Sequence, residues 1–398
     1  MAEKLKLDNF DLEDSEEEIS STKSRKAATP AELEKLYDDT SGRILQERND
    51  FFLPQIRDFV QKKRWVNLRP EYQRRRRWDS KKQSKLIESL LMNVPVPPIF
   101  LYETDLSRYE VMDGQQRLIS IIDFYDGKLI LRNLKAWKNL NGLRYKDLPE
   151  RLKRGLDRRR ISAVILLAES AAPEEIAFAD IRREVFERLN TGGTALNGQE
   201  LRNSIYGGPF NQLIIELART PLFCKMWGIP THGASPRNGL LEKLQENDLY
   251  SKMADCQIVL RFFSFREKQF VSGSVKSMLD SCMKRHQHEK EKRIKEFKTL
   301  FSSRLKLVHD IFGLNAFRLP ASLNARHSRP LSDALMIACD RLWSNASKFK
   351  SKRAHLRKEL DSLLASQKSY SVIVGRPNTA KAVLRRIRLA EKVLKSVL

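Results

Sequence analysis

The stretch Asp113-Gly114-Gln115-Gln116-Arg117 combines residue types that suit the binding of a phosphate group. Gly114 permits a sharp turn or a close approach to the backbone. If a helix begins here, its unpaired backbone N–H groups and its partial positive charge favour an anion. Arg117 in the first turn opposes the helix dipole unless an anion lies nearby. This stretch is therefore our candidate functional site. The alternative is an ordinary Asp-Gly turn followed by two solvated glutamines.

Positioning these residues requires a strand that leads into the stretch and a helix that leaves it. Residues 108–112 form a short run of strand type. The residues after Arg117 place apolar side chains at i, i+3, i+4 and i+7, which is one face of a helix: Leu118, Ile121, Ile122 and Tyr125. Side chains and backbone donors would thus meet where a strand passes into a helix.

Further strands and helices around this stretch predict a small α/β domain over residues 29–168. We expect Ser80 to cap a helix that reaches about Asn93. Strands are expected over residues 99–102, 128–131 and 161–167, of which the last is long, apolar and partly β-branched. Strands that alternate with helices favour a mixed α/β architecture.

A basic segment, residues 68–80, precedes that helix. Four consecutive arginines, Arg74–Arg77, are followed by Trp78. Arginines here would suit phosphates, and Trp78 would suit stacking on a base or on a guanidinium. The alternative is a solvated run of charge.

The second half of the chain, residues 169–398, reads almost entirely as helix. Amphipathic patterns predict helices over residues 173–189, 197–206, 209–219, 247–270, 272–310, 329–346, 350–366 and 378–397. The last part is dense in lysine and arginine. Residues 1–28 are acidic and then rich in Ser, Thr and Lys, and we expect them to be disordered. The predicted fold class is therefore α+β, with a small α/β domain followed by an all-helical domain.

The charge of the chain points to a polyanionic partner. Its 398 residues carry a net charge of +24, and because the first 20 residues carry −6, the remainder carries +30. Nucleic acid is the first candidate, with general solubility or an anionic membrane surface as alternatives. No stretch approaches the roughly 20 apolar residues of a membrane-spanning helix. Four widely spaced cysteines read as free, mostly buried thiols in a reducing cytoplasm.

The residue patterns that several common chemistries require are not evident in the sequence. The glycines Gly193 and Gly198 have the spacing of a P-loop, but Gln199 and Glu200 stand where Lys and Ser or Thr are needed. His286 and His288 are two residues apart, which places them on different faces of a helix. No ligand set for a metal is evident, so the identity of any metal ligand is left unknown.

Five motifs follow one another in a fixed order: Tyr72-Gln73-Arg74 with Trp78, Leu86-Ile87-Glu88-Ser89-Leu90, Val96-Pro97-Pro98-Ile99, Asp113 to Arg117, and Phe186 to Gly193 with Glu200 to Asn203. Together they resemble the N-terminal domain of GmrSD-type modification-dependent restriction enzymes, the DGQQR-motif family. The resemblance covers about residues 50–265. It implies a ParB/sulfiredoxin-like α/β domain that binds and hydrolyses an NTP with Mg²⁺.

Matched residue by residue, the resemblance assigns a nucleotide site. Asp113, Gln115, Gln116 and Arg117 would be its catalytic residues. The nucleotide would also be bound by Gly114, by Gln73 and Arg74 beside it, and by Asn190 and Gly193 closing over it. Members of the family often carry a His-containing nuclease domain, whose motif is not visible here. Arg75, Arg76 and Arg77 also stand where aromatic residues or proline are common in the family.

These observations lead to three hypotheses about function. The first is a cytoplasmic, DNA-binding and NTP-hydrolysing component of a phage-defence or restriction system, which cuts DNA itself or through a separate nuclease subunit. The second is a non-catalytic nucleic-acid-binding regulator or adaptor that retains the fold. The third is a ParB-like nuclease that nicks DNA from the α/β domain.

Overall fold

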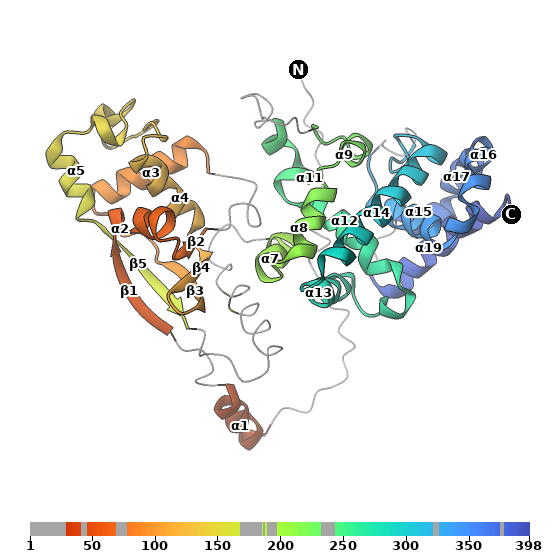
Figure 1. Cartoon of the computed structure of the whole chain (residues 1–398), viewed down its shortest axis with the longest axis horizontal. Coiled ribbons are helices and arrows are strands. Elements are labelled where there is room, and N and C mark those ends of the chain that lie inside the picture. The colour runs from red at the N-terminus through yellow and green to blue at the C-terminus, as the bar shows by residue number, and fades with distance from the viewer. Residues whose placement is uncertain are drawn as a thin grey trace. The chain divides into compact units, whose positions relative to one another are not determined.

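The computed structural model describes residues 29–40, 46–68, 78–167, 185, 188, 197–231, 243–320, 326–374 and 378–398. These residues fall into two compact units, one within residues 19–196 and one within residues 197–398. The first contains a sheet with helices and the second is helical, which confirms the predicted α+β class (Figure 1). The expected disordered segment 1–28 lies outside the described residues. Of the expected helix 173–189, only residues 185 and 188 are described. The boundary at residue 168 stays a prediction.

The α/β unit contains five strands. Its elements are α1 (Pro30–Thr40), β1 (Gln46–Phe52), α2 (Leu53–Arg57), a π-helical turn η1 (Asp58–Lys62), β2 (Val66–Asn67), α3 (Ser80–Leu91), β3 (Ile99–Asp105), β4 (Arg108–Asp113), α4 (Gln115–Tyr125), the 3-10 turns η2 (Lys138–Leu140) and η3 (Tyr145–Asp147), α5 (Glu150–Asp157) and β5 (Arg160–Leu166).

The sheet has the order β1-β5-β3-β4-β2. Strands β3 and β4 form an antiparallel hairpin, and β1 pairs antiparallel with β5. The pairs β3–β5 and β2–β4 are parallel. Because β3 and β4 lie side by side, the end of β4 at Asp113 comes opposite Phe100, near the beginning of β3. That pairing fixes the position of the Asp-Gly turn.

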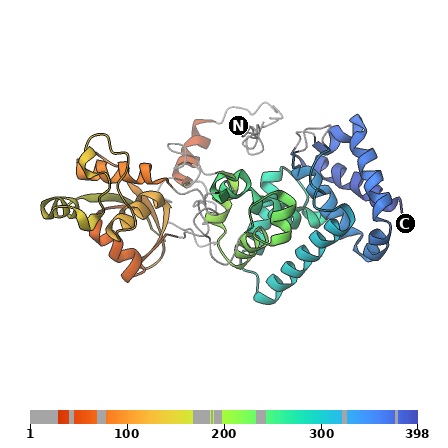
Figure 2. The same ribbon diagram turned by 90° about the horizontal axis from the view of Figure 1, so that it is seen from above.

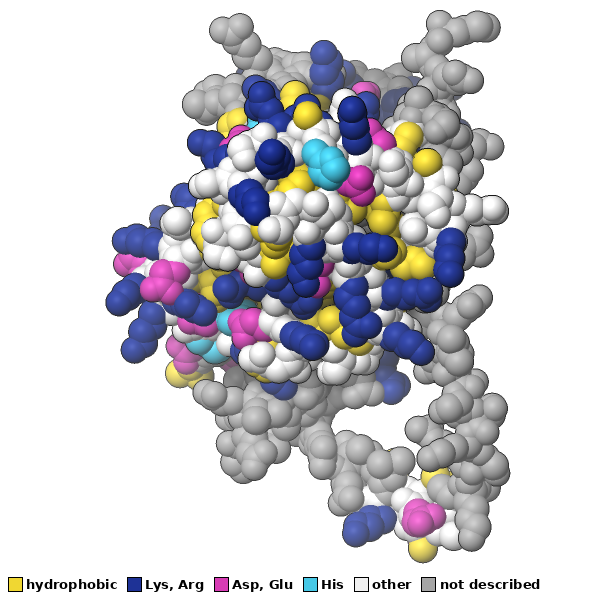
Figure 3. Space-filling view, turned by 90° about the vertical axis from the view of Figure 1, so that its right-hand side faces the viewer, with side chains coloured by type: hydrophobic (Ala, Val, Ile, Leu, Met, Phe, Trp, Pro, Cys, Tyr) yellow, Lys and Arg dark blue, Asp and Glu magenta, His cyan; other side chains and the backbone are white. Residues whose placement is uncertain are grey.

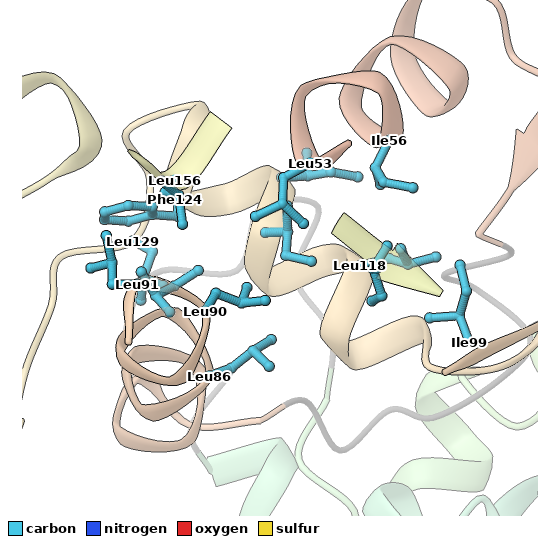
Figure 4. Packing of buried hydrophobic residues seen from close by; sticks show 14 of the residues in the cluster. Leu53, Ile56, Leu86, Leu90, Leu91, Ile99, Leu118, Phe124, Leu129 and Leu156 are labelled. Atoms are coloured by element: carbon cyan, nitrogen blue, oxygen red, sulfur yellow. The ribbon is translucent and has the colours of Figure 1, made fainter. Parts of the chain in front are cut away.

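One apolar cluster joins the helices to the sheet (Figure 4). On β5, buried Ile161, Ala163 and Ile165 alternate with exposed Arg160 and Ser162, the pattern of a sheet with one covered face. Helices α2, α3 and α4 supply the other side of the cluster through side chains that Figure 4 labels, among them Leu53, Ile56, Leu86, Leu90, Leu118 and Phe124. Helix α4 is thereby held firmly along its apolar face.

Several local features differ from what the sequence predicts. Residues 128–131 form no strand, although their buried leucines belong to the core. Helix α3 is capped by Asp79, whose carboxylate accepts the N–H of Lys82, and not by Ser80. Strand β1 was not predicted, because its sequence is polar and it is defined by its pairing with β5.

The second unit consists of helices. They are α7 (Gly198–Ile205), α8 (Pro209–Leu217), α9 (Pro221–Trp227), α11 (Asp248–Ser251), α12 (Ala254–Arg266), η6 (Lys268–Phe270), α13 (Val275–His286), α14 (Glu291–Phe312), α15 (Arg329–Arg341), η8 (Trp343–Asn345), α16 (Ala346–Ser351), α17 (Arg353–Ala365), α18 (Gln367–Val374) and α19 (Ala380–Lys395).

Helix α12 lies at the centre of this unit, with every residue from Ala254 to Phe265 buried. Within it, Arg261 forms a buried ion pair with Asp333 of α15 at 2.6 Å. The 22-residue α14 packs beside α15, and its length is visible in Figure 2. The four cysteines are free and buried, as predicted. No helix among the described residues has both the length and the apolar character needed to cross a bilayer.

Candidate functional site

The candidate site begins at Gly114, which joins β4 to α4 in a left-handed conformation. Its φ is +91° and its ψ is 6°. A Cβ atom at this position would lie 2.5 Å from Cγ2 of Ile99 and 3.0 Å from Nη2 of Arg117. Glycine is therefore required twice, once by the backbone angle and once by the close approach of β3.

No side chain caps the first turn of α4. Gly114 is the N-cap residue, and its carbonyl accepts the N–H of Leu118 at 3.0 Å as the helix begins. Helices usually satisfy their first N–H groups with the side chain of the N-cap residue, which glycine lacks. The helix thus begins with backbone donors and a positive partial charge at a place that suits an anion.

Both glutamines of the motif are buried and hold backbone groups distant in the sequence. The side-chain nitrogen of Gln115 donates to the carbonyl of Leu68 at 2.5 Å. The side-chain oxygen of Gln116 accepts the N–H of Trp78 at 3.0 Å. Leu68 and Trp78 flank residues 69–77, the arginine-rich segment, which lie outside the described residues. The two glutamines therefore hold the flanking residues Leu68 and Trp78 against the start of α4.

The hydrogen bond from Trp78 also affects which hydrogen-bonding groups Gln116 can present to a ligand. A glutamine side chain has one acceptor oxygen and two N–H donors. The backbone N–H of Trp78 occupies one of the two lone pairs of the oxygen, so the two N–H donors are the larger part of the hydrogen-bonding capacity that remains. A donor suits a phosphate oxygen, whereas the polarisation of an attacking water needs an acceptor. The geometry therefore favours anion binding by Gln116.

Arg117 is ion-paired and mostly buried. Its Nη2 donates to Oδ2 of Asp113 at 2.6 Å and to the carbonyl of Pro98 at 3.0 Å. The Arg117 side chain is 14% exposed and that of Asp113 is 46% exposed. The pair offsets the unfavourable position of the arginine in the first turn. The Nε of Arg117 is buried and makes no hydrogen bond to any part of the protein that the structure describes.

The far end of α4 is anchored as firmly as its beginning. Tyr125 donates to Asp157 at 2.8 Å, and Tyr145 donates to the same carboxylate at 3.0 Å. Burial and the bond to Asp157 raise the pKa of Tyr125, and the same causes raise the pKa of Tyr145 to about 12. Asp126, which follows the helix, pairs with Arg57 at 3.0 Å. Helix α4 is thus fixed at both ends.

Five of the nine predicted site residues lie in the part of the chain that the structure describes. It brings Asp113, Gly114 and Arg117 into contact around one turn and directs the amides of both glutamines to the backbone. Gln73, Arg74, Asn190 and Gly193 lie outside the described residues, so their place beside the turn stays a prediction.

The backbone partners of the motif were not predicted from the sequence. The motif donates hydrogen bonds to the carbonyls of Leu68 and Pro98. It accepts one from the N–H of Trp78. No local signal could have identified them, because Leu68 and Trp78 lie 47 and 38 residues from their partners.

A second basic feature of the α/β unit was also missed. An open surface hollow is lined by exposed cations three residues apart and by neighbouring polar groups: Arg132, Lys135, Lys138, Asn133 and Asn141. The loop that forms the hollow is held in place by the carboxylate of Glu88, which accepts hydrogen bonds from the N–H groups of Ala136 and Trp137. The regular spacing of these cations in the sequence was the signal that could have identified the hollow.

Across the described ranges, no group of three or more His, Cys, Asp or Glu side chains is placed to hold a metal ion. A magnesium ion that arrives with a nucleotide needs less, because one or two carboxylates, the phosphates and water complete its shell. Asp113 is the half-exposed carboxylate at the turn that could serve this purpose.

Comparison with known proteins gives one match. Residues 56–207 match the family model described as GmrSD restriction endonuclease, N-terminal domain. The matched range includes the Asp-Gly turn, both glutamine contacts and α7. No curated protein and no solved structure matches the chain. The likeness to ParB and sulfiredoxin folds therefore stays a prediction.

Proposed function

We propose that this protein is a component of a restriction system that binds and hydrolyses an NTP at the turn from Asp113 to Arg117. The proposal is supported by the match of residues 56–207 to the GmrSD restriction endonuclease N-terminal domain model. We propose further that it acts on DNA in the cytoplasm as part of phage defence or of restriction that depends on DNA modification. Cleavage belongs to this chain or to a separate nuclease subunit.

The observation that carries the proposal is the uncapped first turn of α4. Gly114 supplies the left-handed backbone and contributes no capping side chain to the first N–H groups of the helix. Gln116 adds a side-chain donor at the same place. Helix N-termini of this kind bind phosphates through backbone N–H groups and the helix dipole together.

The residues present fit an NTP with Mg²⁺. Phosphoryl transfer depends on charge neutralisation and positioning more than on a covalent nucleophile. Asp113 would hold the magnesium ion or a water through the carboxylate face that Arg117 does not occupy. Arg117 fixes the direction of that carboxylate and adds positive charge to the turn. Gln115 and Gln116 hold Leu68 and Trp78, the residues that flank the arginine-rich segment.

A non-catalytic adaptor is the second candidate, and one observation favours it. The guanidinium of Arg117 already has two acceptors, and both glutamines hold backbone groups. A motif that serves only to fold the strand–turn–helix connection would make the same contacts. The two candidates differ in whether the first turn of α4 must bind an anion.

The substitution Gln116→Glu separates these candidates. A glutamate keeps an acceptor for the N–H of Trp78, so the fold should be retained, but it replaces the donor with a negative charge. We expect the affinity for Mg²⁺–NTP to fall at least ~10-fold, since a close like charge costs more than a kcal/mol in a partly buried site. Phosphate release should fall with it. Gln212→Glu, an exposed position in α8, introduces the same charge far from the motif in sequence and should change neither quantity.

The outcomes are distinct. If Gln116→Glu binds and hydrolyses NTP as the wild type does, the turn is not the nucleotide site. If the wild type releases no phosphate from any NTP, with or without duplex DNA, the enzymatic proposal is wrong and the adaptor stands. Gln115→Glu serves as a contrast, because it loses the donor to Leu68 and should lower the unfolding temperature, which Gln116→Glu should not.

A further inference from the structure

The outer face of α19 carries a line of five cations. Residues at intervals of four, three, four and three along the helix are exposed and basic: Lys381, Arg385, Arg388, Lys392 and Lys395. At about 100° per residue they span an arc of only about 80°. They also extend for about 21 Å at 1.5 Å per residue. We call this set the α19 stripe.

No member of the α19 stripe is in an ion pair or a hydrogen bond with any described side chain. Glu391, the one acidic residue of α19, is turned to the side and pairs with Arg341 of α15 at 3.0 Å. Figure 3 shows the end of the helical unit where α16, α17 and α19 lie, and lysine and arginine side chains outnumber acidic ones over it.

Helix α14 in the same unit shows how exposed cations are usually accommodated. Lys295 pairs with Glu291 at 2.7 Å and Arg293 pairs with Glu296 at 2.8 Å, both within one helical turn. Lys298 pairs with Glu216 of α8. Three exposed cations of α14 are thus paired with acidic neighbours, and those of the α19 stripe are not.

The arrangement is unfavourable for the isolated helix. Like charges at i, i+3 and i, i+4 each cost a few tenths of a kcal/mol. Lys381 lies in the first turn, where a cation opposes the dipole, although Lys392 and Lys395 in the last turn are favourably placed. An extended anion along the stripe would remove the repulsion between all five.

The opposite face of α19 argues against a membrane as that anion. Its apolar side chains, Val383, Ile387, Ala390 and Leu394, are buried, and the helix packs closely on α15. A helix that lies in a membrane interface inserts its apolar face into the lipid. Here that face is already used by the fold, so a purely surface contact remains.

We propose that the α19 stripe binds the phosphate backbone of double-stranded DNA. Its length of about 21 Å corresponds to about six base pairs along the duplex axis, at 3.4 Å per step. Contacts of this kind hold DNA without reading its sequence. The inference rests on the proposed function, in which DNA is the partner, and assigns the surface that meets it.

The test replaces all five stripe residues with glutamine and measures binding to a short labelled duplex by fluorescence anisotropy at several salt concentrations. Glutamine retains helix propensity at exposed positions, so the unfolding temperature should be kept. Each phosphate contact contributes about 0.9 to the slope of log K against log salt, so loss of five contacts should decrease the slope by about 4.5. The affinity at about 100 mM salt should fall at least 10-fold.

The matched control removes the same charge from other exposed positions of the helical unit. It changes five cations of α14 to glutamine: Lys292, Arg293, Lys295, Lys298 and Lys306. We expect its salt slope to stay within about 1 of the wild type, since no phosphate contact is lost. A second variant exchanges lysine and arginine within the α19 stripe, and it should bind DNA as the wild type does because the charge is preserved.

The possible results either support the inference or overturn it. Equal losses in the α19 and α14 variants would show that only net charge matters. Unchanged DNA binding by the α19 variant, or a loss of binding only to anionic vesicles or to an RNA duplex, would also overturn it. A wild-type protein that binds no duplex DNA even at low salt would instead overturn the DNA-directed part of the proposed function. Phosphate release without DNA should be unchanged in both variants.

Discussion

Arg117 of α4 and Arg388 of α19 are arginines held in opposite ways. Arg117 of α4 is 14% exposed and donates to Asp113 and to the carbonyl of Pro98. Arg388 of α19 is exposed and has no partner among the described side chains. A fixed guanidinium serves a reaction that depends on geometry, whereas exposed cations in a line serve attraction to a long anion. The difference separates a site from a surface within one chain.

The contrast between the fixed arginine of α4 and the exposed arginine of α19 predicts its largest effect at Arg117. We expect Arg117→Ala to lower phosphate release by about 100- to 1000-fold, the usual cost of removing one group that stabilises a charged transition state. Arg117→Lys should recover little of this loss, because an ammonium on a different stem does not reproduce the planar, mostly buried guanidinium that places Nη2 between Asp113 and Pro98. The salt slope of DNA binding should be unchanged in both variants.

Arg108→Ala is the matched control, since Arg108 lies at the start of β4 and donates to the carbonyl of Arg64. Steady-state phosphate release by the three variants and the wild type decides the matter. Full activity of Arg117→Lys would mean that the turn needs a charge and not a geometry, and the contrast between α4 and α19 would disappear.

Two glycines at the ends of α4 provide a smaller test of the same geometry. Gly114 and Gly127 both have positive φ, at +91° and +71°, but a Cβ at Gly127 would meet nothing within 4 Å. We expect Gly127→Ala to lower the free energy of unfolding by about 1 kcal/mol from backbone strain alone. Gly114→Ala should cost about 2 to 4 kcal/mol, because a clash with Ile99 is added.

Urea denaturation of both variants measures the difference. Equal losses of stability would contradict the close packing of Gly114 against β3. We also expect Gly114→Ala to lose NTP binding under conditions where it remains folded, and Gly127→Ala to retain it.

The local sequence was sufficient to predict the Asp-Gly turn and helix α19, because both depend on short-range patterns. A strand run, an Asp-Gly pair and apolar residues at helical spacing predicted the connection between β4 and α4, and the structure confirms it. The cations and apolar residues of α19 likewise follow from the helical period. Periodicity identifies which residues share a face, so both elements were accessible from the sequence.

Contacts between distant segments could not be predicted in this way. Strand β1 is polar, and its pairing partner β5 lies more than 100 residues away. Residues 128–131 have the apolar character of a strand but no strand beside them. The bonds from Gln115 to Leu68 and from Gln116 to Trp78 depend on the folded hairpin and helix. The glutamines were therefore expected to contact water or a ligand, whereas their first partners are backbone groups.

A single substitution in the α19 stripe should have the smallest effect. We expect Arg388→Gln to decrease the salt slope of DNA binding by about 0.9, which is one phosphate contact, with a several-fold loss of affinity at low salt. Arg388→Lys should behave as the wild type, in contrast to Arg117→Lys, because an exposed contact to phosphate requires charge and reach more than a planar fork. Fluorescence anisotropy over about 50 to 200 mM salt measures both quantities. If Arg388→Lys lost as much affinity as Arg388→Gln, the stripe would recognise its partner through specific geometry, and α19 would resemble α4 more than the present contrast allows.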